Sequence, residues 1–115
     1  MRFEKFEDII VWQKSQILVI ECYSCFRNIR DYSFRDQIQR AAVSVMNNIA
    51  EGFERMGNKE FKKLLYIAKG SCGEVRSMLY LAEKLGYINK KQLDLLSVQT
   101  TEISKMLSGL IKTLS

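Results

Sequence analysis

Apolar residues at alternating spacings of three and four are the feature that most restricts how this chain can fold. The alternation places their side chains along one face of an α-helix, as an a/d stripe. Such a stripe is stable only when other helices cover it, as in coiled coils and bundles. The last segment is therefore predicted to be one helix of a bundle, with the stripe Leu93, Leu96, Thr100, Ile103, Leu107, Leu110 and Leu114.

The same alternation recurs in two upstream segments, and no strand pattern competes with it. Residues 8–29 are apolar on more than one side, which also suits a packed helix. Four helical segments in succession predict an all-α protein. The two upstream stripes are Ile38, Ala42, Val45, Ile49 and Gly52, followed by Phe61, Leu65, Ala68, Cys72, Val75, Leu79 and Ala82.

Residues that favour helix ends separate these segments. Polar N-caps are predicted before three helices, and glycines able to adopt a left-handed conformation stand at two ends. The predicted caps are Ser33, Asn58 and Asn89, and the glycines are Gly57 and Gly86. The connections are therefore short, and short connections make consecutive helices antiparallel. We predict an up-down-up-down antiparallel four-helix bundle.

Length and composition indicate a single domain spanning residues 1–115. With 115 residues, 47% of them hydrophobic, the chain can bury a core without disulfides or metal. The cysteines are odd in number, and no apolar run reaches the ~20 residues of a membrane span. Acidic residues near the N-terminus occupy the place of a signal peptide's basic region. We expect reduced thiols, no membrane contact and a cytoplasmic location.

The residue types present argue against an enzyme. The chain has no His, which removes the most frequent general base and the usual partner of a nucleophilic Ser or Cys. Cys22 and Cys25 form an isolated CxxC inside a predicted helix, whereas a structural zinc site usually needs a second such pair. Glu51 and Glu74 are interpreted as inter-helix partners of Arg40 or Asn48. We predict no catalytic site, metal, cofactor or small-molecule substrate.

The second predicted helix has a back face that is almost free of charge. Between residues 37 and 50 only Arg40 is charged, whereas a solvated helix face normally carries Lys and Glu. In the third helix Gly70 and Gly73 each cost about 1 kcal/mol relative to alanine. Both features indicate a close helix, within the monomer or across subunits, and we favour subunits. The outward positions include Arg40, Ser44, Asn47 and Glu51 on the second helix and Gly70 and Glu74 on the third.

Basic residues gather at two predicted turns. The formal net charge is +5, and residues 55–63 hold four cations against one carboxylate. Such cations can contact phosphates without reading bases, although composition alone favours a solvated loop and helix start. The two turns lie at opposite ends of an up-down bundle. The candidates are Arg55, Lys59, Lys62 and Lys63 at one turn and Lys90 and Lys91 at the other. Tyr66, Tyr80 and Tyr87 have rings on which exposed bases can stack, but we expect these rings to be buried.

Several strings of the sequence match a known family in order and separation. They are VWQKS at 11–15, QIQRAAVSVMNNIAEGFER at 37–55, EFKKLLYIAKGSCGEV at 60–75 and LAEKLGYI at 81–88. With these strings the chain resembles, over nearly its whole length, the family of 23S rRNA intervening-sequence proteins. The resemblance implies a small bacterial four-helix bundle that assembles as a ring-like homopentamer. More distantly, the chain is similar to the basic accessory protein of diversity-generating retroelements, which engages nucleic acid and a reverse transcriptase.

The resemblance also bears on individual residues and on function. It assigns the motif residues to packing and assembly, and it implies a homo-oligomer that binds RNA or other nucleic acid weakly. The alternative is a scaffold that docks a protein partner, such as a polymerase, without touching nucleic acid. The positions that match the family motif are Arg40, Asn48, Glu51, Gly52, Gly70, Ser71 and Glu74.

Overall fold

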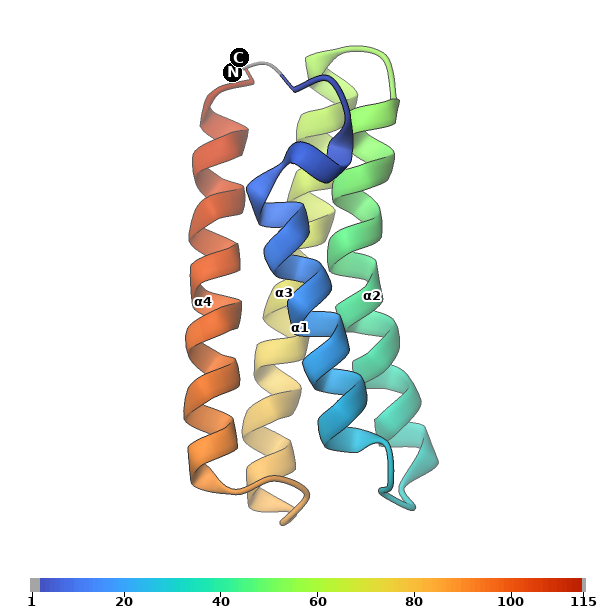
Figure 1. The fold of residues 1–115 in the computed structure, drawn as a ribbon, viewed down its shortest axis with the longest axis vertical. Coiled ribbons are helices and arrows are strands. Elements are labelled where there is room, and N and C mark those ends of the chain that lie inside the picture. Colours follow the sequence, from blue (N-terminus) through green and yellow to red (C-terminus); the bar gives the residue numbers. More distant parts are fainter. Residues whose placement is uncertain (1–2, 115) are drawn as a thin grey trace.

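The computed structural model describes residues 3–114 and consists of helices joined by short turns. Figure 1 shows each long helix running antiparallel to the one before it, in a rod measuring 43 × 22 × 19 Å. The predicted all-α, up-down-up-down four-helix bundle is confirmed. Its elements are the 3-10 turn η1 (Phe6–Asp8) and the helices α1 (Ile10–Phe26), α2 (Tyr32–Glu54), α3 (Asn58–Lys84) and α4 (Lys90–Lys112).

The helices pack in the order in which they follow one another along the chain. α2 packs against α1 and α3, α3 against α2 and α4, and α4 returns to α1. The turns between α1 and α2 and between α3 and α4 therefore lie at one end of the rod, and the turn between α2 and α3 lies at the other (Figure 1). α3 consequently has a neighbouring helix on each side.

The core consists of the predicted stripes. Every residue of the three stripes is buried, and Leu65, Leu79 and Leu107 are fully enclosed. Each such leucine contributes about 1.5–3 kcal/mol through removal of its side chain from water. The polar member of the α4 stripe, Thr100, is buried with its hydroxyl donating to the Ser97 carbonyl oxygen at 3.0 Å. The 3/4 alternation thus identified the inward face of each helix correctly.

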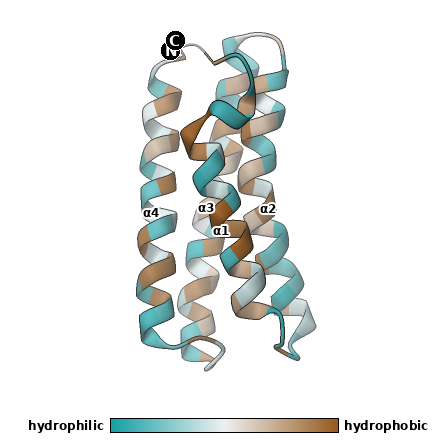
Figure 2. Ribbon diagram, viewed as in Figure 1, coloured by the Kyte–Doolittle hydropathy of each residue, from teal (hydrophilic) through white to brown (hydrophobic). Residues whose placement is uncertain are grey.

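α1 is apolar beyond its inward face, as predicted. Leu18 and Cys22 lie in the core, whereas Ile10, Ile17 and Ile20 are more than half exposed. Figure 2 shows the hydrophobic colouring of α1 where the helix faces outward. The exposed isoleucines are not needed to fill the core of one chain.

The helix ends follow the predicted chemistry with two shifts of position. The capping box of Asn89 and Gln92 is present, with hydrogen bonds of 2.8 and 2.9 Å. Gly57 and Gly86 both have positive φ, at 91° and 79°, a conformation that side chains with a Cβ rarely adopt. α2 is capped by Asp31 instead of Ser33, and Asn58 is already the first residue of α3. None of the helices within residues 3–114 combines the length and the hydrophobicity of a membrane span.

Candidate nucleic-acid interface

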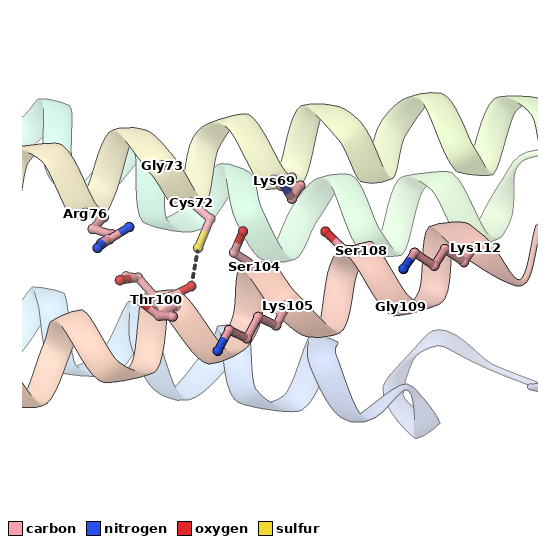
Figure 3. A pocket seen from close by; sticks show the side chains of 11 residues that line it. Lys69, Cys72, Gly73, Arg76, Thr100, Ser104, Lys105, Ser108, Gly109 and Lys112 are labelled. Atoms are coloured by element: carbon pink, nitrogen blue, oxygen red, sulfur yellow. Dashed lines mark hydrogen bonds between the residues drawn. The ribbon is translucent and has the colours of Figure 1, made fainter.

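A groove runs between α3 and α4 along the side of the bundle, with a volume of about 510 Å³. Figure 3 shows side chains from both helices converging on it. We call it the α3/α4 groove. Its lining residues are Lys69, Cys72, Gly73 and Arg76 from α3 and Thr100, Thr101, Ser104, Lys105, Ser108, Gly109 and Lys112 from α4.

Four of the lining residues are basic and none is acidic. Lys69 and Arg76 are seven residues apart on α3, as are Lys105 and Lys112 on α4, which corresponds to about 10.5 Å along each helix. Within residues 3–114 these four cations form no ion pair. Lys112 lies in the last turn of α4, where a cation also stabilises the helix dipole. Lys69, Arg76 and Lys105 have no such second role, and the charge they contribute is available to an anion.

The floor of the groove is closed by a hydrogen bond between the two helices. The Cys72 thiol donates to the Thr100 carbonyl oxygen at 3.2 Å (Figure 3). Burial raises the pKa of Cys72 to about 11, while Arg76 and Lys69 act in the opposite direction by favouring the thiolate. The two cations thus produce a positive potential at the floor, and the thiol itself stays protonated and unreactive at neutral pH.

Hydroxyl groups and small residues complete the groove. Thr101, Ser104 and Ser108 are half-buried along α4, and their hydroxyls can donate to anionic oxygens. Gly73 and Gly109 leave the walls open, because a Cβ added at either position would meet no atom within 4 Å. Cations combined with hydroxyl donors suit the oxygens of phosphate groups. A repeating phosphate backbone fits an elongated groove of this kind better than a compact anion does.

The sequence predictions did not include the groove, although a signal for it was present. Lys62, Lys69 and Arg76 repeat every seven residues, and Lys105 and Lys112 have the same spacing. This spacing shows that the cations of one helix share a face. It does not show that the two basic faces meet across one groove, because that depends on how α3 and α4 pack.

Within residues 3–114, some of the cations predicted at the turns are paired with carboxylates, and others are free to contact an anion. Arg55 donates to Glu60 at 3.1 Å and to Glu51, and these carboxylates raise its pKa, the Glu51 hydrogen bond most strongly. Lys90 pairs with Asp94 at 3.2 Å. Among the described residues the other predicted cations form no ion pair: Lys59, Lys62, Lys63 and Lys91. The two turns lie at opposite ends of the rod, as expected (Figure 1).

Comparison with known proteins identifies the family. The sequence profile described as "23S rRNA-intervening sequence protein" matches residues 7–109. The chain belongs to the 23S rRNA-intervening sequence protein family. Its fold is similar to the crystal structure of a protein of unknown function from the S23 ribosomal protein family of Bacteroides thetaiotaomicron, with a TM-score of 0.84 and 25% sequence identity over 89% of this chain and 98% of that one. No curated protein matches the chain.

In this family member, three half-buried polar residues of the predicted interface join α2 to α3. The hydroxyls of Ser44 and Ser71 share a hydrogen bond of 2.8 Å. Asn48 donates its side-chain amide to the Ser44 carbonyl oxygen at 2.8 Å and to the Ser44 hydroxyl at 2.9 Å. These three residues therefore have partners within one chain, and their presence needs no second subunit.

Three further motif residues are also explained within the chain. Gly52 allows α2 and α3 to approach, because an added Cβ would lie 2.9 Å from Phe61 Cδ1 and 3.1 Å from Leu64 Cβ. Glu74 accepts a hydrogen bond of 3.3 Å from Gln37, and Glu51 binds Arg55. The expected partners of the two carboxylates, Arg40 or Asn48, are therefore not the ones observed.

Arg40, Asn47 and Gly70 are the predicted interface residues that packing within the chain leaves unexplained. All three are exposed, and a Cβ added at Gly70 would meet no atom within 4 Å. Within the described residues neither Arg40 nor Asn47 forms a side-chain hydrogen bond. The subunit interface stays a prediction, and these residues on the outer face of α2 and α3 are its centre.

The three tyrosines that were expected to bury their rings are exposed or only half-buried. Tyr66 and Tyr80 are 56% and 49% exposed, so the prediction is wrong for both. The Arg76 guanidinium lies over the Tyr80 ring, 6.0 Å from its centroid. Tyr87 is half-buried and donates to Asp31. The period of α3 favours an outward position for Tyr66 and Tyr80, since both fall outside the a/d stripe.

The cysteines and carboxylates do not assemble into a metal site in the part of the chain described. Among residues 3–114 no group of three or more Cys, Asp or Glu side chains is placed to hold an ion. Burial raises the pKa of Cys22 to about 12, and burial together with Glu21 raises that of Cys25. The CxxC pair thus consists of two protonated thiols on the packed side of α1.

Proposed function

We propose that the protein is a non-enzymatic, self-associating helical bundle that binds RNA weakly through its phosphates, without reading base sequence. The observation that carries this proposal is the α3/α4 groove, where Lys69, Arg76 and Lys105 form no ion pair with a carboxylate of residues 3–114. The family description, which refers to an intervening sequence of 23S rRNA, supports RNA as the polyanion. Cations that contact phosphates give affinity that is independent of sequence.

Further basic residues lie on α3 between its start and the groove. Lys62 stands seven residues before Lys69 on α3, so the basic face continues toward the start of the helix, where Lys59 and Lys63 lie. Lys112, in the last turn of α4, lies at the same end of the antiparallel pair (Figure 1). A backbone that enters the groove from this end would meet cations along its path.

Self-association is supported by the outer face of α2 and α3. Arg40, Asn47 and Gly70 are exposed there without partners from the described part of the chain. A ring of chains, with five as the number that the family resemblance implies, would place several basic grooves on one particle. Weak contacts repeated in this way give avidity, since each additional contact is made at high effective concentration.

The proposal is tested by the salt dependence of RNA binding and by reversal of the groove charge. We expect log K to fall linearly with log salt, by about 0.7 for each phosphate contact with a single strand. Lys69→Glu together with Lys105→Glu should reduce both affinity and salt slope. Arg27→Glu with Arg30→Glu makes the same change in net charge at exposed positions remote from the groove and serves as control. Unchanged affinity and slope in the groove variant would contradict the proposal.

A second function, docking of a protein partner such as a polymerase, is favoured by a different observation. Apolar side chains that the core does not use are exposed on α1 and α4: Ile17 and Ile20 on the first and Leu95 and Val98 on the second. Such side chains gain from contact with another apolar surface. Binding through them would change little with salt, whereas phosphate contacts weaken steeply, and the salt titration separates the two functions.

A further inference from the structure

A second stripe with 3/4 alternation runs along α3, beside the α3/α4 groove and outside the core. Its spacings are four, three, four, three and four, so its members share one face of the helix. Three of them are basic and two are tyrosines. The stripe consists of Lys62, Tyr66, Lys69, Gly73, Arg76 and Tyr80, of which Lys69, Gly73 and Arg76 line the groove.

The two tyrosines present exposed aromatic rings beside the groove, and the Arg76 guanidinium lies over the ring of Tyr80, 6.0 Å from its centroid. Tyr66 lies one helical turn from both Lys62 and Lys69, and it is 56% exposed. Tyr80 lies one turn after Arg76 and is 49% exposed. Neither ring belongs to the hydrophobic core or packs against its rim. Each ring therefore stands beside a groove cation with much of its surface open to a ligand.

Cations alternating with exposed rings match the two chemical faces of an unpaired nucleic-acid strand. Its phosphates attract the cations, and its bases, which are not held in a duplex, can stack on aromatic rings. Stacking is tolerant of sequence, because every base has a π-face. We propose that the α3/α4 groove and this second, outward stripe of α3 together bind a single strand. The phosphates would lie in the groove and the bases on Tyr66 and Tyr80. This inference rests on the proposed function and specifies its ligand.

The shape of the groove also favours a single strand over a duplex. The groove lies between two packed helices, whose axes in such pairs are ~8–10 Å apart. Three of its donors are recessed, because Lys69, Ser104 and Ser108 are half-buried. A rigid duplex would reach the outermost cations but would keep its bases stacked internally, away from Tyr66 and Tyr80. A flexible strand can enter the groove and turn its bases outward.

The test compares a labelled oligouridylate, which has no secondary structure, with an RNA duplex of the same length by fluorescence anisotropy. The intact chain should bind the oligouridylate more tightly. Tyr66→Ala and Tyr80→Ala should each weaken that binding by about 5- to 150-fold, the range that corresponds to loss of one stacked base. Their salt slopes should stay unchanged because no phosphate contact is lost, in contrast to Lys69→Glu.

Two control variants exclude a general effect of losing a tyrosine. Tyr80→Phe keeps the ring and should keep the affinity. Tyr32→Ala removes another exposed tyrosine with an arginine over its ring, Arg35 at 4.8 Å, on α2. It should bind like the intact chain. Circular dichroism of every variant verifies that the bundle is folded.

The outcomes separate this inference from the function on which it rests. Equal or tighter binding of the duplex, or full affinity in both Tyr66→Ala and Tyr80→Ala, would overturn the single-strand site and leave phosphate binding intact. Absence of binding to either RNA would overturn both proposals. Preference for the oligouridylate that depends on the two rings would support the single-strand site.

Discussion

Tyr87 donates its phenolic hydroxyl to Asp31 at 2.7 Å, across 56 positions of sequence. Asp31 also accepts the backbone N–H of Phe34 at 3.1 Å and so caps α2, while Tyr87 follows the end of α3. The Phe34 and Tyr87 rings meet edge to face, with centroids 5.3 Å apart. One carboxylate thus ties together the two turns at one end of the bundle.

This contact should make stability depend on pH. The hydrogen bonds from Tyr87 and then Phe34 lower the pKa of Asp31, so its stabilising effect is complete above the unfolded pKa of about 3.9 and is lost as pH falls through the lower folded value. Tyr87→Phe should lower Tm at pH 7, and its difference from the intact chain should shrink on acidification below about pH 4. Thermal melts monitored by circular dichroism measure both, with Tyr32→Phe as control. A difference that is constant with pH would contradict the link to Asp31.

Gly52→Ala should destabilise the bundle by about 1–3 kcal/mol, the usual cost of overpacking. The added methyl would lie 2.9 Å from the Phe61 ring and 3.1 Å from Leu64 Cβ, neither of which is the free end of a flexible side chain. Gly73→Ala is the matched control, since a methyl there meets no atom within 4 Å. It should stabilise α3 by roughly 0.5–1 kcal/mol. Urea unfolding measures both changes, and equal stabilities would refute the packing argument at Gly52.

Asn47→Lys should reduce the assembled mass while leaving helical content unchanged, if the outer face of α2 and α3 joins subunits. The new charge would have to be desolvated in an interface, which is costly without a partner. Gln16→Lys places the same charge on the exposed surface of α1 and is the control. Light scattering on a sizing column gives the mass. An assembled mass that is unaffected by Asn47→Lys would place the interface elsewhere, and a chain that is already monomeric would exclude self-association.

The thiols should differ in reactivity. Cys22 and Cys72 are buried and their pKa values are raised to about 12 and 11, whereas Cys25 is only half-buried. Since the thiolate is the reactive form, a disulfide reagent at pH 8 should modify Cys25 first. The other two should react only as fast as the bundle opens. Mass spectrometry of the time course identifies the modified cysteine, and early modification of Cys22 would show that α1 is less firmly packed than described.

The sequence did not predict that the basic faces of α3 and α4 meet at one groove. The seven-residue spacing of Lys69 and Arg76, and of Lys105 and Lys112, was readable in the chain. Whether these two faces adjoin, and whether carboxylates neutralise them, depends on side chains from different helices. Arg55 was predicted to contact phosphates, yet its guanidinium donates hydrogen bonds to Glu51 and Glu60.

The sequence by itself determined the helices, their inward faces, the Asn89 capping box and the family. These are local properties, because the side-chain direction repeats with the helical period and a cap involves residues within one turn. Tertiary structure decided which polar residues have partners in the chain, such as Ser44 with Ser71, and which cations and rings stay available at the α3/α4 groove. Those properties depend on contacts between helices, such as that of Ser44 with Ser71 across 27 positions of sequence, and no spacing within one helix contains that information.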